Sequence, residues 1–249
     1  MSSERIDKLL LARGLFDSRA AAQAAIRAGR VRVAGQTVRR SSAKVAPDAV
    51  IEAQPLHPYV SRGGVKLAHA LDQFSLDPAG RHCLDIGAST GGFSEVLLLA
   101  GAASVTAVDV GRGQMHARLR GDPRLISMEG RDARSLGPAD LVHPPELVVC
   151  DASFIALSKV LGVPLSLAAP EARLVCLFKP QFEVGRAHVA KGGIVRDDEA
   201  VLRARDAVVV WLDDQGWSVT AWTDSPIPGG DGNREYLFLA VPGPVPGPA

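Results

Sequence analysis

Four charged residues lie at places in the sequence where a purely structural role is less natural. Asp151 closes the run ELVVCD and Lys179 closes the run LVCLFK. Lys66 lies in YVSRGGVKL, and Glu235 opens EYLFLAV. Two lysines and two carboxylates in one pocket balance each other's charge and could orient a weakly acidic hydroxyl group and remove its proton. Each residue alone is equally explained by a surface ion pair, so only the ordered set of four indicates a catalytic site.

A glycine-rich turn after the run CLDI has the form of a cofactor-binding loop. Its pattern is D-x-G-x-x-x-G-G, and closely spaced glycines let backbone N–H groups approach a ligand. A dinucleotide site needs G-x-G-x-x-G, and Ser89 stands where the second glycine is required. The acid before the turn suits a cofactor with a positively charged amine and would repel a pyrophosphate. The residues expected at this cofactor site are Asp85, Gly87, Ser89, Thr90, Gly91, Gly92 and Phe93.

Two more acids follow the next two apolar runs. Asp109 ends SVTAVD, where a carboxylate can accept hydrogen bonds from both hydroxyls of a ribose. Asp132 comes after RLISM and could accept a hydrogen bond from an adenine amino group, although a solvated turn explains it equally well. The glycine-rich turn followed one strand later by Asp109 predicts a cofactor that carries a nucleoside.

The elements that must position these residues alternate between strands and helices. Strands are predicted at 83–87, 104–110, 124–128, 146–151, 174–179, 216–222 and 234–241. Helices are predicted at 62–74, 92–100 and 197–214. Such alternation is typical of a parallel sheet covered by helices on both faces, and ligands bind at the carboxyl ends of its strands. We therefore expect an α/β fold with a Rossmann-like sheet.

The first sixty residues differ from the rest in charge. They hold ten Lys/Arg and five Asp/Glu, a net charge of +5, whereas the remainder holds eighteen and twenty-two, a net charge of −4. Two short helices and small strands are expected here, which makes a small α+β module. Guanidinium groups pair bidentately with phosphate, so the module is expected to bind nucleic acid, although arginines that only solvate it are the plain alternative. The expected contacts are Arg5, Arg13, Arg19, Arg27, Arg30 and Arg32.

These observations divide the chain into four parts. The basic module covers residues 1–52, and a linker with two prolines covers residues 53–60. The α/β body covers residues 61–241. Residues 242–249 are low in complexity, and we expect them to be disordered.

The N-terminal module resembles the RNA-binding domain first described in ribosomal protein four of the small subunit. The resemblance rests on Arg5-x-Asp7, Gly14-Leu15, Ser18-Arg19, Ile26 and Gly29-x-Val31-x-Val33-x-Gly35. Ala34 departs from the family's turn, which usually has asparagine at that point. The resemblance implies that the module binds RNA.

The body resembles the FtsJ-type RNA ribose 2′-O-methyltransferases, whose Lys-Asp-Lys-Glu tetrad matches Lys66, Asp151, Lys179 and Glu235. The glycine-rich turn resembles the S-adenosylmethionine loop of class I methyltransferases. The whole chain is similar to the TlyA (hemolysin A) family, which joins these two domains. Matching segments are SRGGVKL, LDIGASTGGF, CDASFIAL, KPQFEVG, KGGIVRD and GNREYL. The resemblance implies a class I methyltransferase sheet and S-adenosylmethionine-dependent 2′-O-methylation of ribosomal RNA, free or in a ribosomal subunit.

In that reaction Lys179 is the candidate nearest the hydroxyl, while Lys66 and Glu235 would position the ribose. Lys66 would favour loss of a proton from Lys179 and Asp151 would oppose it, so the sequence leaves the protonation of Lys179 open. Three departures from the family lie nearby: Ala152 replaces a larger residue, Arg112 an aromatic one, and Asp132 a frequent Asn. Arg112 argues against adenine stacking at that point.

The segment after Lys179 offers further RNA contacts. Phe182 could stack on a base, and Lys191 lies in a glycine-flanked loop that could close over RNA. The alternative is a structural lid with Phe182 in the core. Arg62, close to Lys66 in sequence, is expected to contact RNA as well.

Several classes of protein are disfavoured. The three cysteines have neither CxxC nor His/Cys spacing, so we expect reduced thiols and no metal. The apolar run 96–108 has 13 residues, fewer than the ~20 of a membrane span, and the first 25 residues lack the apolar core of a signal peptide. We therefore expect a cytoplasmic protein without a membrane partner.

Other functions stay open at this point. A non-catalytic RNA-binding assembly factor is disfavoured by the complete set of four, a hemolysin by the missing membrane span, and a nicotinamide oxidoreductase by Ser89. The sequence does not identify the target nucleotide. The short tail after the last strand resembles the family's shorter members, which favours large-subunit RNA.

Overall fold

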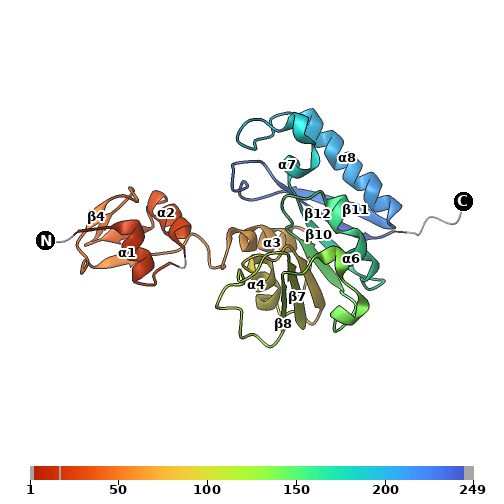
Figure 1. Ribbon diagram of the computed structural model, residues 1–249, viewed down its shortest axis with the longest axis horizontal. Helices are drawn as coiled ribbons and strands as arrows, with labels where there is room; N and C mark the ends of the chain where they lie inside the picture. Colours follow the sequence, from red (N-terminus) through yellow and green to blue (C-terminus); the bar gives the residue numbers. More distant parts are fainter. Residues whose placement is uncertain (1–2, 17, 244–249) are drawn as a thin grey trace, which may run out of the picture. The chain divides into compact units, whose positions relative to one another are not determined.

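The computed structural model describes residues 3–16 and 18–243. The chain forms two compact units, Met1–Pro58 and Tyr59–Ala249, each with its own buried core (Figure 1). Within the segment for which disorder is predicted, Pro242 ends a strand and residues 244–249 lie outside the described part.

The N-terminal unit packs two helices against small antiparallel sheets. Its elements are β1 (Glu4–Arg5), α1 (Ile6–Ala12), α2 (Arg19–Arg27), β2 (Val31–Val33), β3 (Gln36–Thr37), β4 (Lys44–Val45) and β5 (Ile51–Ala53). The strand order is β3-β2-β5, and β1 pairs with β4. Ser18 begins α2 by accepting the N–H of Ala21 at 3.1 Å, and the buried side chains of Ile6, Leu10 and Ile26 form the core. β1 and β4 each have two residues, so these strands are too short to show an alternating apolar pattern in the sequence.

The second unit is a seven-stranded sheet with helices on both faces. Its strands are β6 (His82–Ile86), β7 (Ser104–Asp109), β8 (Leu125–Glu129), β9 (Leu147–Cys150), β10 (Arg173–Phe178), β11 (Trp217–Asp224) and β12 (Tyr236–Pro242). Its α-helices are α3 (Arg62–Gln73), α4 (Gly92–Leu99), α5 (Leu157–Val160), α6 (Gly162–Ser166), α7 (Pro180–Glu183) and α8 (Asp198–Asp214). The 3-10 turns are η1 (Ala133–Ser135), η2 (Pro138–Asp140) and η3 (Arg186–His188).

Side chains that alternate along each strand build two separate cores. Val148 and Cys150 pack with residues of α5, α6 and α8, whereas Leu147 and Val149 pack with residues of α3 and α4. The sheet is thereby buried on both sides, which explains why its strands read as continuous apolar runs. Among the described residues, none of the helices has the length and hydropathy of a membrane span.

The strand order is β11-β12-β10-β9-β6-β7-β8. The sheet is parallel as expected except at β12, which runs antiparallel to both β10 and β11. The segment 225–235 between β11 and β12 contains no crossover helix, so the chain turns back at the same end of the sheet. From β6 the chain adds β7 and β8 on one side of this strand, and it then returns to add β9 and the later strands on the other side. The carboxyl ends of β6 and β9 therefore form the point where ligands bind in such sheets.

Candidate active site

The loop between β6 and α4 approaches the chain after β9 very closely. Gly87 has φ 77°, and a Cβ atom there would lie 2.8 Å from the Cα of Ala152. Both the positive φ and the close contact require glycine. Two cavities of about 300 and about 640 Å³ adjoin this contact, and Gly87, Ser89 and Asp151 line both of them. An extended ligand can therefore occupy both cavities.

Asp109 forms one wall of the larger cavity. Its carboxylate accepts the backbone N–H of Ser89 at 2.8 Å and that of Gly111 at 2.7 Å, one on each oxygen. A carboxylate oxygen can accept two hydrogen bonds, so each oxygen keeps a position for a ligand. Asp109 therefore keeps free acceptor positions on the wall of the larger cavity, and its role as the acceptor of a ribose diol stays a prediction.

Other residues of the predicted loop divide into those that line a cavity and those that do not. Ser89, Thr90, Gly92 and Phe93 line the smaller cavity, together with Ser61, Arg62 and Gly63. Gly91 is absent from the lining of both cavities. It precedes α4 with φ 91°, and a Cβ there would clash with the side chains of Leu119 and Met115.

Asp85 is the acid that precedes the glycine-rich turn. It is fully buried behind the loop and lines neither of the two cavities that the described residues form. Strand alternation directs its side chain to the α3/α4 face, where the Ser94 hydroxyl donates to Oδ2 at 2.6 Å; Oδ1 has no hydrogen-bond partner among the described residues. Burial raises the pKa of Asp85 to about 7. Its effect on the loop is therefore indirect.

Asp132 lines the larger cavity, but its side chain already has partners. It accepts the N–H of Arg134 at 2.9 Å and pairs with the Arg134 guanidinium at 2.6 Å, which lowers the pKa of Asp132. A ligand amine would share this carboxylate with Arg134. The Arg112 guanidinium lies against Gly130, where a Cβ would be 2.5 Å from its Cζ.

Two residues that the sequence did not single out shape the same wall. Glu129 accepts the backbone N–H groups of Gly113, Gln114 and Met115 at 2.9, 2.6 and 2.8 Å, and these bonds lower the pKa of Glu129. Gln114 lines the larger cavity and accepts the Ser89 hydroxyl at 2.8 Å. Contacts of this kind go largely to backbone and leave no pattern in the sequence.

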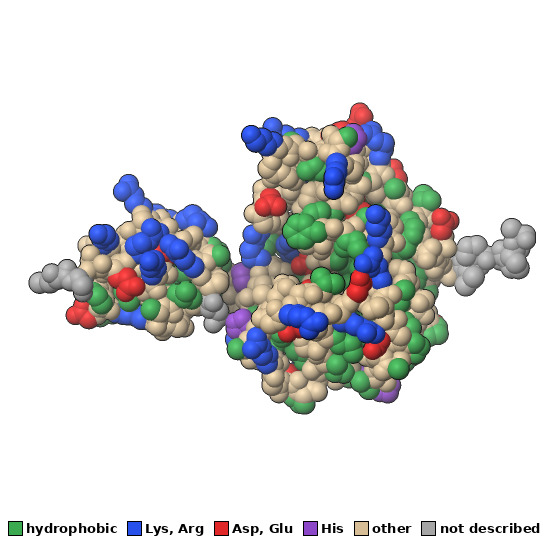
Figure 2. Space-filling view, in the orientation of Figure 1, with side chains coloured by type: hydrophobic (Ala, Val, Ile, Leu, Met, Phe, Trp, Pro, Cys, Tyr) green, Lys and Arg blue, Asp and Glu red, His purple; other side chains and the backbone are tan. Residues whose placement is uncertain are grey.

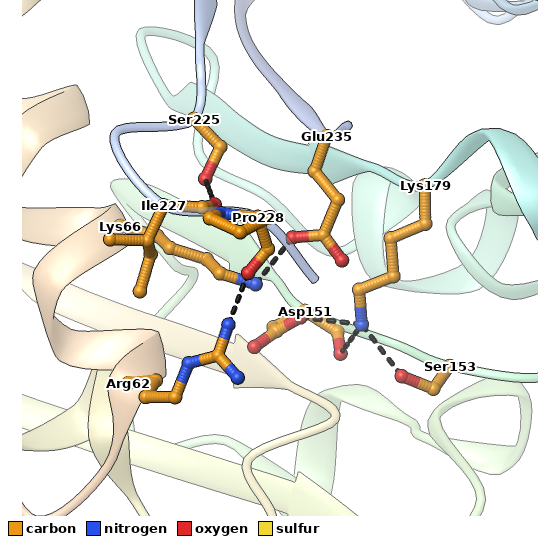
Figure 3. A network of polar contacts seen from close by, with 9 residues as sticks. All are labelled: Arg62, Lys66, Asp151, Ser153, Lys179, Ser225, Ile227, Pro228 and Glu235. Atoms are coloured by element: carbon orange, nitrogen blue, oxygen red, sulfur yellow. Dashed lines mark hydrogen bonds and ion pairs between the residues drawn. The ribbon is translucent and has the colours of Figure 1, made fainter. Parts of the chain in front are cut away.

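The four charged residues singled out by the sequence converge beside these cavities as two ion pairs (Figure 3). Lys66 of α3 is hydrogen-bonded to Glu235, which precedes β12, and both are buried. Lys179, at the end of β10, is also buried, and its Nζ lies 2.6 Å from Oδ1 of Asp151. Buried charges persist only when paired, so the two partners of each ion pair hold one another in place.

Lys179 also donates two hydrogen bonds. Its Nζ donates to the backbone oxygen of Asp151 at 3.0 Å and to Oγ of Ser153 at 2.6 Å (Figure 3). Oδ1 of Asp151 forms an ion pair with Nζ but accepts no hydrogen bond among the described residues, so two hydrogen bonds and one ion pair fix this nitrogen. Sequence reasoning missed Ser153, because a serine in a loop is not distinctive.

Aromatic side chains lie close to this centre. Phe154 is 90% exposed with φ 66°, an uncommon conformation for a bulky residue, and its ring centroid lies 5.2 Å from that of Phe182. Phe182 is half-buried, and Lys191 is exposed on the loop that follows. Arg62 lines the smaller cavity and donates to the backbone oxygen of Pro228. Phe154 was not predicted, because only its exposure and backbone reveal it.

The predicted arginines of the N-terminal unit are held in two ways. Arg5 and Arg19 pair with the buried Asp7 at 3.0 and 2.8 Å, which holds the pKa of Asp7 far below its usual range. Arg13 donates to the backbone oxygens of Ala49 and Pro47. Arg27, Arg30 and Arg32 are exposed, and Figure 2 shows Lys and Arg side chains gathered on this unit.

Comparison with known proteins identifies the family. Residues 59–241 match the family of FtsJ-like methyltransferases, and residues 4–51 match the S4 domain. A protein of Mycobacterium tuberculosis named 16S/23S rRNA (cytidine-2′-O)-methyltransferase TlyA is 43% identical over 94% of this chain and 88% of its own. Hemolysin A of Brachyspira hyodysenteriae is 38% identical over 94% of this chain and 98% of its own. This chain belongs to the TlyA (hemolysin A) family.

Solved structures agree with the family assignment. A structure described as a hemolysin of Streptococcus thermophilus has a TM-score of 0.78 at 37% identity, covering 99% of this chain and 90% of that one. An S-adenosylmethionine-dependent methyltransferase of Listeria monocytogenes, at a TM-score of 0.55 and 14% identity over 74% of this chain and all of that one, shares the fold. The predicted family, the methyltransferase fold and the S-adenosylmethionine dependence are confirmed for this TlyA-family chain.

The residues present fit that cofactor. The glycine cradle at Gly87 admits a close ligand, two cavities that share lining residues lie beside it, and Asp109 has acceptor positions left. Asp132 and Gln114 line the larger cavity and Arg62 the smaller one, so the nucleoside and amino-acid ends would meet different polar groups.

Proposed function

We propose that this protein methylates the 2′-hydroxyl of a ribose in ribosomal RNA. The observation that carries the proposal is the pair of ion pairs, Lys66 with Glu235 and Lys179 with Asp151, beside cavities that fit the methyl donor. The names of the M. tuberculosis relative and of a Campylobacter jejuni relative, 39% identical over 74% of this chain and 71% of its own, specify cytidine-2′-O and 23S rRNA. We take a cytidine of large-subunit RNA as the target.

We assign each part of the cofactor to one of the two cavities. S-adenosylmethionine supplies a methyl group on a positively charged sulfur, which is a good electrophile. Asp109 would accept the hydroxyls of its ribose, and Asp132 its adenine amino group. Arg62 and Ser61, at the start of α3, would hold its carboxylate in the smaller cavity. Asp151 lines both cavities and so lies near the place where the two ends join.

Lys179 is the group that would meet the attacking hydroxyl. Of the two hydrogen bonds that its Nζ donates, one goes to the backbone oxygen of Asp151 and the other to the hydroxyl of Ser153, which is exposed. A ribose 2′-oxygen that replaced Oγ of Ser153 would be held by a charge-assisted hydrogen bond. The ammonium group then stabilises negative charge on the oxygen while the proton passes to Asp151, which is partly exposed.

Lys66 and Glu235 form the other wall of the site. Because Lys66 lies on α3 and Glu235 at the start of β12, their pairing fixes the distance between these elements. Holding the ribose between two rigid pairs turns the methyl transfer into a reaction between aligned groups. Neither residue needs to exchange a proton for this role.

RNA affinity is assigned to the S4 domain and to exposed groups of the body. Arg5 and Arg19 are fixed by Asp7 with part of each guanidinium exposed, and the first sixty residues carry a net charge of +5. In the body, Phe182, Lys191 and Arg62 stay candidate RNA contacts. An enzyme of ribosomal RNA works where ribosomal subunits are assembled, so we place it in the cytoplasm, with rRNA or a ribosomal subunit as partner.

The test is methyl transfer from labelled S-adenosylmethionine to purified large and small ribosomal subunits and to their free RNA. Digestion to nucleosides followed by mass spectrometry should give 2′-O-methylcytidine from large-subunit RNA. A methyl group on a base would overturn the proposed chemistry. A protein that binds the RNA and the cofactor without transferring label in a single turnover would instead be an assembly factor.

A further inference from the structure

A short basic arm follows α7, and we define it as residues 185–197. Its tip is a small hairpin: Val189 bridges Val195, and Ala190 N–H donates to the backbone oxygen of Ile194 at 2.9 Å. The glycines at its turn, Gly192 and Gly193, have φ of 90° and 81°. The arm leads directly into α8 (Figure 1).

The arm carries exposed cations. The side chains of Arg186, Lys191 and Arg196 are exposed, and among the described residues Arg186 and Lys191 have no carboxylate within ion-pair distance. His188 pairs with Asp197 at 2.9 Å at the base of the arm, where Asp197 also caps α8. Cations held without a partner beside an RNA site are available for phosphate groups.

Asn233, far away in the sequence, holds this arm. It is 2% exposed, its Oδ1 accepts the N–H of Val195 at 2.9 Å, and its Nδ2 donates to the backbone oxygen of Gly193 at 2.8 Å. The amide thus acts as a neighbouring strand's peptide group would. Asn233 is the only asparagine among the 249 residues.

The same segment fixes Glu235. The backbone oxygen of Asn233 accepts the N–H of Gly229 at 2.8 Å, and a Cβ on Gly229 would lie 2.5 Å from Oε1 of Glu235. Two residues after Asn233, Glu235 pairs with Lys66. The arm is therefore attached to both walls of the site: by α7 to Lys179, and by Asn233 to the segment of Glu235.

We propose that Asn233 is a positioning residue that holds the basic arm over the ribose site, so that Arg186 and Lys191 bind phosphate groups of the RNA substrate. The inference rests on the proposed function. Asn233 itself touches neither RNA nor cofactor. Its side chain fixes where the arm's charges stand relative to Glu235, and so it sets RNA affinity rather than the rate of methyl transfer.

The experiment compares steady-state kinetics on ribosomal RNA for four proteins: the full chain, Asn233→Ala, Arg186→Ala with Lys191→Ala, and all three changes together. We expect Asn233→Ala to raise KM for RNA about tenfold, with kcat and cofactor affinity within twofold of the unmodified chain. In the background without the two cations, Asn233→Ala should change KM by less than twofold. Arg173→Ala is the control and should leave KM unchanged. Arg173 begins β10, so this change removes a cation at the end of the strand opposite to the site.

Structural damage gives a different result from the proposed role. If Asn233 only stabilised the fold, its loss would raise KM equally with and without the two cations, or would lower kcat and cofactor affinity, and either result overturns the inference. Asn233→Asp keeps the acceptor for Val195 and loses the donor to Gly193, so it carries the test if the alanine variant does not fold. Amide exchange at Val195 should quicken in both variants. An unmodified chain that binds RNA but transfers no methyl group would contradict the proposed function instead.

Discussion

The carboxylate of Asp109 accepts the backbone N–H of Ser89 at 2.8 Å and so ties the end of β7 to the loop after β6. Ser89 has φ 46°, a left-handed conformation that costs a residue other than glycine ~1–2 kcal/mol. The hydrogen bond from Ser89 to Asp109 helps to hold this conformation. One acid therefore shapes the cofactor loop and also presents its remaining acceptor positions to the cavity.

Asp109→Ala should weaken S-adenosylmethionine binding by ~1–3 kcal/mol, because the ribose hydroxyls lose their acceptor and the Ser89 loop loses its tie. Calorimetric titration of the cofactor measures this. Asp132→Ala is the matched control, since its carboxylate is already occupied by Arg134, and it should weaken binding less. Equal affinities for Asp109→Ala and the unmodified chain would contradict the assignment.

Asp85 should make stability depend on pH. Burial raises the pKa of Asp85 to about 7, so the folded state holds the proton more tightly than the unfolded chain, whose pKa is near 3.8. Asp85 therefore contributes to the free energy of unfolding, by roughly 4 kcal/mol at most. This contribution is fully present below about pH 4 and is lost as the pH rises through about 7. Urea unfolding of Asp85→Asn, which cannot ionise, should show a flatter profile from pH 5 to 8. Parallel profiles for both proteins would rule this out.

The placement of the charged residues could be predicted because it follows from strand geometry. Asp109, Asp151 and Lys179 each end an apolar run, and the carboxyl ends of parallel strands share one edge of a sheet. The orientation of Asp85 could not be predicted, because it depends on which face of β6 its side chain takes relative to the loop. An acid at the end of a strand and one inside it look alike in sequence.

Partners that depend on tertiary contact also escaped prediction. Ser153 meets Lys179, and Asn233 meets the backbone of Val195, only after segments distant in sequence come together. The antiparallel direction of β12 depends on how the chain returns from β11, which apolar periodicity does not encode. The exposed Phe154 depends on its positive φ, for which a phenylalanine gives no sign in sequence.

Asp7 should stabilise the N-terminal unit in a pH-dependent way. Hydrogen bonds from Arg5, Gln23 and Arg19 hold its pKa below the usual range, so its contribution is present above about pH 4 and lost as the pH falls. In Asp7→Asn, amide exchange of α1 should be faster than in the unmodified chain at pH 7, and the two should converge near pH 3. A difference that persists unchanged at pH 3 would show that charge pairing is not the cause.

A chain that begins at Tyr59 should keep cofactor affinity and lose most RNA affinity. The residues that line the two cavities begin at Ser61, whereas the net charge of +5 lies in the first sixty residues. In a plot of log binding constant against log salt concentration for large-subunit RNA, the slope should become less steep by about 0.7–0.9 for each phosphate that is no longer contacted. Titrations of both proteins at several salt concentrations measure this slope, and equal slopes would refute the division of labour.

Lys179→Ala should abolish methyl transfer while cofactor affinity stays within about twofold. Lys179 ends β10, and its Nζ contacts Asp151 and Ser153 but does not belong to the lining of either cavity. Asp151→Ala should be similarly inactive, because a buried ammonium without its carboxylate loses both its orientation and its charge balance. Single-turnover transfer of labelled methyl to large-subunit RNA measures both losses, and calorimetry measures the cofactor.

Lys179→Arg is the stringent form of the same test. In this site a single nitrogen makes two hydrogen bonds and one ion pair, whereas a planar guanidinium spreads its donors over three nitrogens. The arginine variant should therefore stay inactive although its charge is kept. Ser153→Ala is the control that separates positioning from chemistry: it removes the one neutral acceptor that the ribose oxygen would replace, and it should retain substantial turnover. Near-normal turnover by Lys179→Arg would show that positive charge alone suffices, and that the fixed geometry of the ammonium group has no part in the reaction.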